Sequence, residues 1–521
     1  MKTELLTNRR DFLKGTLWMG ATAALAGRVA HAAKVCGPGA MTAFAAAPIK
    51  KVRVGVVGLG MRGPGAVHRL SSIPGVEVAA LCDLYKGRVD RMQDLLKKNG
   101  APAARSYFVY DGEKGEGADE SKAWMAMCDS ELDLVYIASP WKLHTPIALY
   151  AMEHGKHVAI EVPAAMNMEE CWACVETSER TGRHCMQLEN CCYGEVEMLT
   201  LNLVRQGMLG DLVHGEGAYI HDLRSLNYLD PAKGGYQDYW RLRWNTVHDG
   251  NPYPTHGLLP IMQAMNINRG DRFDYLTCVA SNQIGMDAYA KTTFGEDSWQ
   301  ARLHPRCGDM STTVIRTVKG RTIMVQHDVT SPRPYSRINL LSGTQGVLHD
   351  YPLRVALAAK PGEGAHAWYN FTKEDAEKVL GRTIETDAYG NWMINIHEVE
   401  TLNNDYAYRI KAEYQHPLWK AAGALAQKMG GHGGMDFLMD LRLCYCLQNG
   451  LPLDMDVYDL AASCSLCELS ERSVMNRGAS QDVPDFTRGG WKTAEPLGIV
   501  NVDLDRLGIK DVKRDEGQLN V

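Results

Sequence analysis

The first third of the chain alternates short β-branched runs with stretches that have the spacing of helices. Continuous apolar runs of this length are typical of strands buried on both faces of a parallel sheet. Four such strands are predicted at 51–57, 76–81, 132–138 and 157–160. Helical stretches at 64–70 and 147–154 connect them in pairs. The pattern therefore predicts a doubly wound α/β domain.

After about residue 190 the regular alternation ends, and β-rich or alternating segments take over. They lie at 212–221, 275–283, 312–318 and 322–329. Alternating patterns favour an antiparallel sheet with one covered face. We predict a second, α+β domain with an open, mostly antiparallel sheet and a helical C-terminal segment. The predicted boundaries are 51–188 for the first domain and 189–521 for the second.

A glycine-rich motif follows the first predicted strand directly, as Gly58-Leu59-Gly60-Met61-Arg62-Gly63. Such a turn between a strand and a helix lets the backbone and the helix N-terminus approach a pyrophosphate. Asp83, which ends the second strand, can accept hydrogen bonds from ribose hydroxyls and repels a 2′-phosphate. The first domain is therefore predicted to be a Rossmann domain that binds NAD rather than NADP, although Arg62 and Lys86 are cations that could pair with a phosphate.

The N-terminus has the pattern of an export signal. Asn8 to Lys14 contains the pair Arg9-Arg10, and a weakly apolar stretch then leads to Ala30-His31-Ala32. This twin-arginine pattern predicts a signal peptide at 1–32 and a linker at 33–50, with export to the periplasm by the twin-arginine machinery. The apolar stretch is shorter than the roughly 20 residues that a membrane span needs, so no stable span is expected.

Composition narrows the function further. The chain has 521 residues, 23% of them charged, and a formal net charge of -6 without a basic run, which argues against a nucleic-acid partner. Its 14 cysteines include Cys171-x-x-Cys174 and Cys464-x-x-Cys467. Both pairs lie in helical stretches without histidines in zinc spacing, so we interpret them as core thiols and expect no metal.

Two further motifs follow strands whose carboxyl ends face a ligand in an open α/β sheet: Ser139 to Pro146 and Glu161-Val162-Pro163. With them the chain from Lys51 onward resembles the glucose-fructose oxidoreductase, inositol dehydrogenase and rhizopine-catabolism family. Most dehydrogenases of that family carry a lysine at the position of Val162 and an aspartate at that of Pro252. The usual dehydrogenase apparatus for proton transfer is therefore incomplete here.

These departures resemble one branch, glycoside hydrolase family 109. The matching segments are Gly60 to Gly63, Trp141 to His144, Glu161 to Pro163, Tyr253 to Gly257, Met265 to Arg272, His432 to Asp436 and Pro452 to Asp459. The resemblance implies an NAD-dependent α-N-acetylgalactosaminidase that keeps NAD tightly bound. It oxidises the sugar at C3, eliminates the aglycone, adds water and returns the hydride, without net oxidation.

Site residues follow from the resemblance position by position. The cofactor would contact Met61, Arg62, Asp83, Trp141, Lys142, Leu143, His144, Glu161, Val162, Asn190 and Tyr253. The sugar would contact Tyr219, Arg241, Tyr253, Pro254, Thr255, His256 and Tyr335. His256 is the predicted acid/base, with Tyr253 as its catalytic partner. The competing structural interpretations are a buried structural His256, a Tyr253 or Tyr219 that only packs, and an Arg241 paired with a surface acid.

Three other functions stay open at this point. One is a true NAD-dependent sugar or cyclitol dehydrogenase, and a second is a non-catalytic sugar-binding protein that holds NAD. The third is a glycosidase of the same branch with another sugar preference. The expected partner is a small-molecule or glycan substrate, and a homo-oligomer formed through the open sheet is compatible with the sequence.

Overall fold

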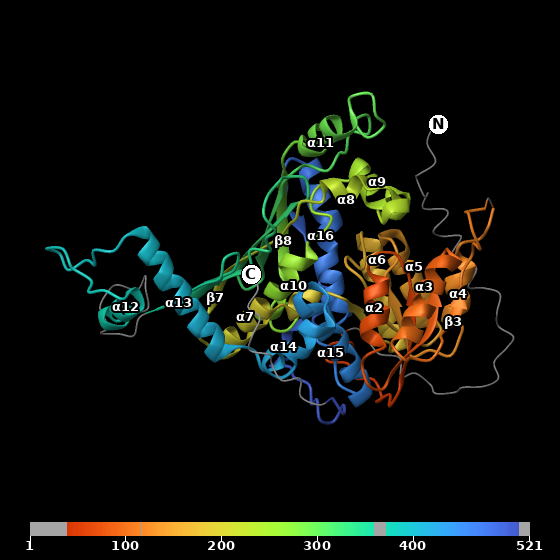
Figure 1. Cartoon of the computed structure of the whole chain (residues 1–521), viewed down its shortest axis with the longest axis horizontal. Helices are drawn as coiled ribbons and strands as arrows, with labels where there is room; N and C mark the ends of the chain where they lie inside the picture. The colour runs from red at the N-terminus through yellow and green to blue at the C-terminus, as the bar shows by residue number, and fades with distance from the viewer. Residues whose placement is uncertain (1–38, 116, 359–370, 510–521) are drawn as a thin grey trace. The chain divides into compact units, whose positions relative to one another are not determined.

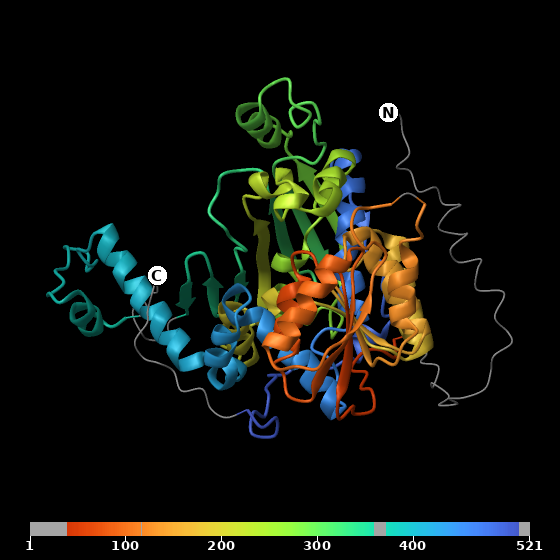
Figure 2. The same ribbon diagram turned by 45° about the vertical axis from the view of Figure 1, so that its right-hand side comes forward.

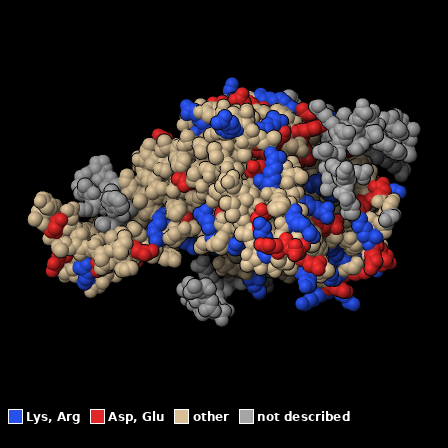
Figure 3. All heavy atoms as spheres, turned by 90° about the horizontal axis from the view of Figure 1, so that it is seen from above, with Lys and Arg blue, Asp and Glu red and all other residues tan. Residues whose placement is uncertain are grey.

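A computed structural model describes residues 39–115, 117–358 and 371–509. The predicted signal peptide and the beginning of the predicted linker lie outside the described residues. Among the described residues, no helix combines the length and the apolar character needed to cross a membrane. On the face shown in Figure 3, acidic and basic side chains intermingle, so no single sign of charge dominates it.

The first domain contains a parallel sheet, as predicted, and this sheet has six strands. Its strands are β1 (Val52–Val57), β2 (Val76–Cys82), β3 (Arg105–Tyr107), β4 (Leu134–Ile137), β5 (His157–Ile160) and β6 (Cys185–Gln187). Their order is β3-β2-β1-β4-β5-β6, with every neighbouring pair parallel. This is the strand order of a Rossmann fold, in which the order reverses between β1 and β4. The prediction missed β3 and β6, which are only three residues long.

Helices cover both faces of this sheet, as Figure 2 shows. They are α2 (Gly63–Leu70), α3 (Lys86–Lys98), α4 (Ser121–Cys128), α5 (His144–Glu153) and α6 (Met168–Thr181). Helix α2 packs on α3, whereas α4, α5 and α6 pack on one another in sequence order. Their amphipathic spacing buries one side of each helix, as Val89, Met92 and Leu96 of α3 illustrate.

The second domain contains a mostly antiparallel sheet, as predicted, and this sheet has eight strands. Its strands are β7 (Leu212–Ile220), β8 (Phe273–Ala280), β9 (Ser311–Thr317), β10 (Thr322–Asp328), β11 (Leu340–Gly343), β12 (Gly346–His349), β13 (Arg354–Leu357) and β14 (Gln481–Asp482). They follow the order β13-β12-β11-β7-β10-β9-β8-β14. Only the central pair β7 and β10 is parallel in the described sheet.

Helix α10 (Thr255–Ala264) crosses β7 at very short range. A Cβ atom built on Gly217 would lie 2.2 Å from the carbonyl oxygen of Gly257, and one built on Gly257 would lie 2.2 Å from the amide nitrogen of Ala218. Only two glycines allow this approach of backbone to backbone. It places the first turn of α10 beside the end of β7.

The other helices of the second domain surround this arrangement. They are α7 (Glu195–Arg205), α8 (Arg224–Tyr228), α9 (Trp240–Val247), α11 (Gly285–Phe294), α12 (Lys373–Leu380), α13 (Ile396–Tyr414), α14 (Pro417–Met429), α15 (Met435–Asn449) and α16 (Val457–Met475). Helices α12 and α13 pack on each other, and α13 contacts β13 at the end of the sheet (Figure 1).

The last long helices return to the first domain. Helix α15 packs on α2 and β1, while α16 lies between α6 and β8 and touches both sheets. One continuous hydrophobic cluster therefore includes Val54 of β1, Leu466 of α16 and Ile323 of β10. The cysteines of both CxxC pairs are buried free thiols in α6 and α16, in agreement with their interpretation as core residues.

Candidate functional site

A cavity of about 970 Å³ opens where the parallel strands end at their carboxyl edge. The segments after β1, β2, β4 and β5 form one side, and residues of the second domain form the other. Most sequence-predicted site residues meet in its wall. These are Met61, Arg62, Asp83, Trp141, His144, Glu161, Val162, Asn190, Tyr219, Arg241, Tyr253 and His256.

The glycine-rich loop has the shape that the motif predicts. Gly58 has a φ of +89°, and a Cβ there would lie 2.4 Å from the carbonyl oxygen of Ala138. At Gly63, a Cβ would come within 2.0 Å of the Gly58 carbonyl oxygen, whereas nothing lies within 4 Å of one at Gly60. The first and third glycines are thus required by the backbone, and the second leaves open space on the cavity side.

Asp83 ties this loop to the end of β2. Its carboxylate accepts hydrogen bonds from the backbone N–H groups of Leu59 (2.8 Å) and Tyr85 (3.1 Å). The Arg88 guanidinium donates to the same carboxylate at 3.3 Å and to Gln237 at 2.7 Å. An acid at the end of β2, glycines that open the loop and a helix N-terminus beside them fit the ribose and pyrophosphate of NAD.

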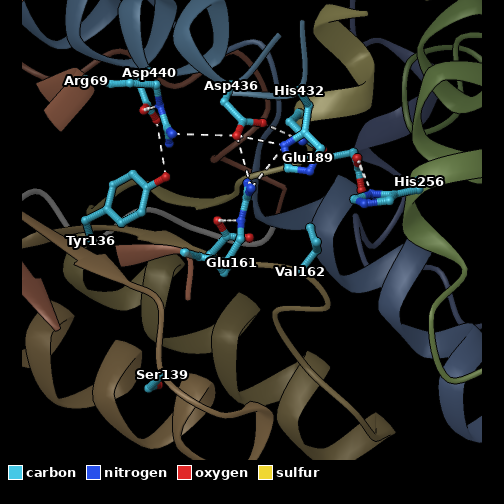
Figure 4. Close-up of polar contacts among 12 residues, drawn as sticks. Arg69, Tyr136, Ser139, Glu161, Val162, Glu189, His256, His432, Asp436 and Asp440 are labelled. Carbon is cyan, nitrogen blue, oxygen red and sulfur yellow. Dashed lines mark hydrogen bonds and ion pairs between the residues drawn. The ribbon is translucent and has the colours of Figure 1, made fainter. Parts of the chain in front are cut away.

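Arg62 lies at the centre of an ion-pair cluster on the cavity wall. Its partners Glu161, Asp436 and His432 are labelled in Figure 4. Its guanidinium pairs with Glu161 at 2.9 Å and with Asp436 at 3.0 Å. Asp436 also accepts a hydrogen bond from Asn190 at 2.5 Å and lies 3.0 Å from Nδ1 of His432. Burial raises the pKa of Asp436, but the His432 contact and the Arg62 cation outweigh burial and hold this pKa well below its ordinary value.

A group of aromatic rings surrounds Arg241 in the wall formed by the second domain. The guanidinium carbon lies 4.8 Å from the ring centre of Tyr253, 5.2 Å from Trp141 and 5.8 Å from Tyr219. Its Nη1 donates to the Tyr236 hydroxyl at 3.3 Å. Within the described residues, no carboxylate comes within ion-pair distance of this buried cation. It is therefore free to bind polar groups of a ligand.

His256, in the first turn of α10, lies between two groups. Its Nδ1 is 2.7 Å from Oε1 of Glu189, and its Nε2 is 3.5 Å from the Tyr253 hydroxyl. The rings of Tyr253 and Tyr219 lie 4.9 Å and 5.2 Å from the imidazole. Burial raises the pKa of Tyr219 to about 12, so its hydroxyl stays protonated at neutral pH. The arrangement supplies one proton acceptor and two hydroxyl donors at the same place in the cavity.

Trp141, Val162 and His144 shape the wall between the glycine-rich loop and the aromatic group around Arg241. The Trp141 indole donates to the Val162 carbonyl oxygen at 3.2 Å. Both ring nitrogens of His144 face backbone carbonyl oxygens, of Pro163 at 2.8 Å and of Ser139 at 2.7 Å. His144 therefore connects the segments after β4 and β5, and its imidazole is already engaged by backbone.

Five predicted residues do not belong to the cavity wall. Lys142 is exposed, and Leu143 packs against the core of the first domain. Pro254 and Thr255 are buried directly before His256. The Tyr335 ring lies behind Tyr219, at 6.4 Å between centres, and its hydroxyl accepts a hydrogen bond from Arg337. Their predicted contacts stay predictions.

The structure also adds residues that the sequence did not single out. Arg88, Tyr236 and His221 line the cavity, and Glu189 binds His256 from behind. Glu189 directly precedes the predicted residue Asn190, so position along the chain was the one available signal. His432 and Asp436 belong to a segment used only for the family resemblance, and folding brings both to Arg62.

Comparisons with known proteins agree with this geometry. A family model described as the C-terminal domain of glycosyl hydrolase 109 matches residues 193–382 and 383–493. Another, described as the NAD-binding Rossmann fold of an oxidoreductase family, matches residues 52–188. An alpha-N-acetylgalactosaminidase of Bacteroides fragilis is 44% identical over 446 residues, which cover 85% of this chain and 94% of the relative. The chain belongs to glycoside hydrolase family 109.

Another relative matches this chain over nearly its whole length. A glycosyl hydrolase family 109 protein of Shewanella amazonensis is 43% identical over 502 residues, which cover 95% of this chain and 99% of that protein. The family 109 chain is thus a glycoside hydrolase with an NAD-binding Rossmann domain.

Solved structures with a similar fold are oxidoreductases. A levoglucosan dehydrogenase in complex with NADH and levoglucosan superimposes with a TM-score of 0.55 at 17% identity, covering 84% of this family 109 chain and 100% of that chain. An aldose-aldose oxidoreductase from Caulobacter crescentus gives 0.52 at 15% identity, covering 83% and 100%. At such low identity the likeness concerns the fold alone.

Proposed function

We propose that this enzyme hydrolyses terminal α-N-acetylgalactosamine residues by an NAD-dependent, redox-neutral mechanism. The single observation that carries the proposal is the arrangement of one cavity, which begins at the glycine-rich loop and ends at His256, Tyr253 and Arg241. The printed name of the Bacteroides fragilis relative supplies the sugar. Val162 supports a function other than net dehydrogenation, because most related dehydrogenases carry a lysine at this position and a valine side chain cannot transfer a proton.

The glycine-rich loop and Asp83 would hold NAD, which would supply a reversible hydride acceptor for C3 of the sugar. His256 would take the proton of the C3 hydroxyl, because its Nε2 faces Tyr253 and the cavity. The resulting ketone makes the hydrogen at C2 acidic, so a base can remove that proton while the C1–oxygen bond breaks. Water then adds to C1 and C2 regains its proton. Return of the hydride to C3, and of the proton held by His256 to the C3 oxygen, would restore the original oxidation state of the sugar.

Arg241 and the two tyrosines would support the charge that develops during these steps. The buried guanidinium has no carboxylate partner in the described structure, so it can donate to a sugar oxygen. Tyr219 and Tyr253 would donate hydrogen bonds from neutral hydroxyls, because burial raises the pKa of both groups. Donors fixed before the reaction stabilise an enolate better than solvent does.

Tight retention of NAD is part of the proposal. Its support is the cluster around Arg62, in which Asp436 and His432 from the C-terminal region lie against the glycine-rich loop. A loop held between two carboxylates stays ordered without ligand, which lowers the entropic cost of binding. Protein purified without denaturation should therefore carry nucleotide, which acid extraction and chromatography would identify.

The test of the activity is release of p-nitrophenol from the α-N-acetylgalactosaminide while the NADH absorbance is followed in parallel. The proposal expects p-nitrophenol without accumulation of NADH. NADH that grows in step with a free sugar product would identify a dehydrogenase instead. Sugar-dependent thermal stabilisation without turnover of any glycoside would favour the non-catalytic binding protein.

Export by the twin-arginine route is proposed from the N-terminal pattern Arg9-Arg10 and the Ala30-His31-Ala32 site. Replacement of both arginines by lysine should leave the enzyme in the cytoplasm of its host. Fractionation of cells that produce the two forms measures this directly. Equal amounts of both forms in the exported fraction would exclude the route.

A further inference from the structure

Glu189 stands behind His256 in a position that the reaction described above does not yet use. It precedes the short helix η3 (Asn190–Tyr193), and its Oε1 accepts the backbone N–H of Cys191 at 3.0 Å. The same oxygen lies 2.7 Å from Nδ1 of His256. The side chain is completely buried. Its carboxylate is thus fixed by backbone on one side and by the imidazole on the other.

The charge of Glu189 has one ionic partner. In the described part of the chain, no lysine or arginine lies within ion-pair distance of it, and His256 does. Burial raises the pKa of Glu189, but His256 and the Cys191 N–H outweigh burial and hold this pKa below its ordinary value. The carboxylate is therefore ionised at neutral pH and faces the imidazole across a single hydrogen bond.

The hydrogen bond also determines which imidazole nitrogen carries the proton. A carboxylate can only accept, so the neutral ring must donate from Nδ1 and leave Nε2 as the proton acceptor. Nε2 is the atom that faces Tyr253 and the cavity. Pro252, the position at which related dehydrogenases carry an aspartate, offers no acid here. Glu189, from a different element, supplies a carboxylate to the same imidazole.

We propose that Glu189 is the positioning residue that keeps His256 in the Nδ1-protonated tautomer and strengthens Nε2 as the proton acceptor of the glycosidase reaction. This inference rests on the proposed function, since His256 acts there on the sugar. A carboxylate hydrogen-bonded to a catalytic histidine orients the ring and stabilises the imidazolium that forms when it takes a proton.

The other ionisable groups around the imidazole come from every neighbouring segment. They are Cys191 on η3, Tyr219 and His221 at the end of β7, Tyr253 before α10, and Arg241 on α9 beyond the Tyr253 ring. Burial raises the pKa of both tyrosines and of the Cys191 thiol, so these three groups stay neutral near pH 7. Glu189 is the anion among the groups that touch the ring.

Glu189→Gln isolates the charge. Oε1 of Glu189 accepts the hydrogen bonds from Cys191 and His256, so a glutamine can keep these two bonds without the negative charge. The Thr255 hydroxyl also interacts with the carboxylate, and a glutamine would offer it an amide group instead. We expect kcat/KM to fall by about 10- to 100-fold, mainly through kcat. In a plot of kcat/KM against pH, the acidic limb should move to lower pH by about one unit. Glu189→Asp should keep the limb near its original place, because it keeps the charge. Glu197→Gln is the matched control, a buried carboxylate paired with Arg337 outside the cavity wall, and its limb should stay unmoved.

Imidazole nitrogen NMR of the full chain provides a readout that does not depend on turnover. The His256 signal, assigned by its loss in His256→Asn, should show a protonated Nδ1 in the wild type and a lower titration midpoint in Glu189→Gln. An Nε2-protonated wild type, or an unchanged midpoint and acidic limb in Glu189→Gln, would overturn the inference. A wild type that cleaves no glycoside but shows the expected NMR signals would instead refute the proposed function alone.

A bound metal would require another explanation of the same residues. Ligand atoms of Glu189, Cys191 and His256 lie within 4.8 Å of one another. The purified enzyme could contain stoichiometric metal and show the signal of a protonated Nδ1 of His256 only after the metal is removed. The metal would then occupy Nδ1, and the inference would fail. Metal-free enzyme that retains full activity after chelation supports it.

Discussion

Asp436→Asn should weaken both the fold and the retention of NAD. The carboxylate is buried and interacts with Arg62, Asn190 and His432, and it also lies 3.6 Å from Nη1 of Arg69. Asparagine has the same shape but no charge, and its amide NH₂ group would face donors. The substitution therefore removes one negative charge that two arginines share, without creating a cavity.

The expected cost can be derived from these contacts. Removal of one partner from a buried ion pair costs about 3–5 kcal/mol. Arg62 keeps Glu161 and Arg69 keeps Asp440, so the lower end applies, about 3 kcal/mol. For a chain of 521 residues the entropy of unfolding is on the order of 1 kcal/mol/K. The melting temperature should thus fall by about 3 °C.

The difference in unfolding free energy between the wild type and Asp436→Asn should be constant around neutral pH. The pKa of Asp436 is lowered in the folded protein, so its contribution is fully present above the unfolded value of about 3.9. It is lost only as the pH falls through the lower folded pKa. The two proteins should therefore converge in stability only below about pH 4.

Calorimetry and extraction of bound nucleotide are the two assays. Asp454→Asn is the matched control, because Asp454 is an equally buried partner of Arg442 and Tyr193 but lies outside the cavity wall. Both variants should lose stability, and only Asp436→Asn should also lose nucleotide. Full nucleotide occupancy in Asp436→Asn, together with an unchanged melting temperature, would refute the reasoning.

Three further predictions concern single side chains. Asp83→Ser should improve the affinity for NADP relative to that for NAD by at least about tenfold, because Arg88 is then free to bind a 2′-phosphate. Calorimetry on nucleotide-free protein measures both affinities, and an unchanged ratio argues against this role of Asp83. Arg241→Met should raise KM by about 10- to 150-fold through loss of a charge-assisted hydrogen bond, and a KM within twofold of wild type would contradict substrate contact. Burial lowers the pKa of His327 to about 3, below its unfolded value of about 6.5, so its contribution to stability is lost as the pH falls from about 6.5 to 3. His327→Leu should therefore reduce the slope of unfolding free energy against pH in that range by up to about 1.4 kcal/mol per unit, and parallel urea titrations of both proteins would show whether it does.

The sequence predicted the parts of the fold whose pattern is local. Strands β1, β2, β4 and β5 are mainly apolar runs, and the glycine-rich turn follows β1 at the expected place. Strands β3 and β6 are too short to carry a pattern of their own. They form because neighbouring strands offer a free edge, which depends on tertiary structure.

The site likewise contains residues that the sequence pattern could place and residues that it could not. Asp83 and Glu161 follow strands directly, so topology alone predicts that they meet at one edge of the sheet. Asp436, by contrast, reaches Arg62 only because α15 packs on α2, which no local pattern indicates. Glu189 could not be assigned from the chain, since its role depends on the close crossing of α10 over β7 that brings His256 to it.

The Arg62 cluster also has a consequence for synthesis of the protein. Arg62 pairs with Glu161, which lies 99 residues further along the chain, and with Asp436, which lies 374 residues further along. While the ribosome is still translating the second domain, the glycine-rich loop exists without Asp436 or His432. Nucleotide capture in its final form must therefore wait until α15 has emerged and packed on α2, which makes cofactor loading one of the last events of maturation.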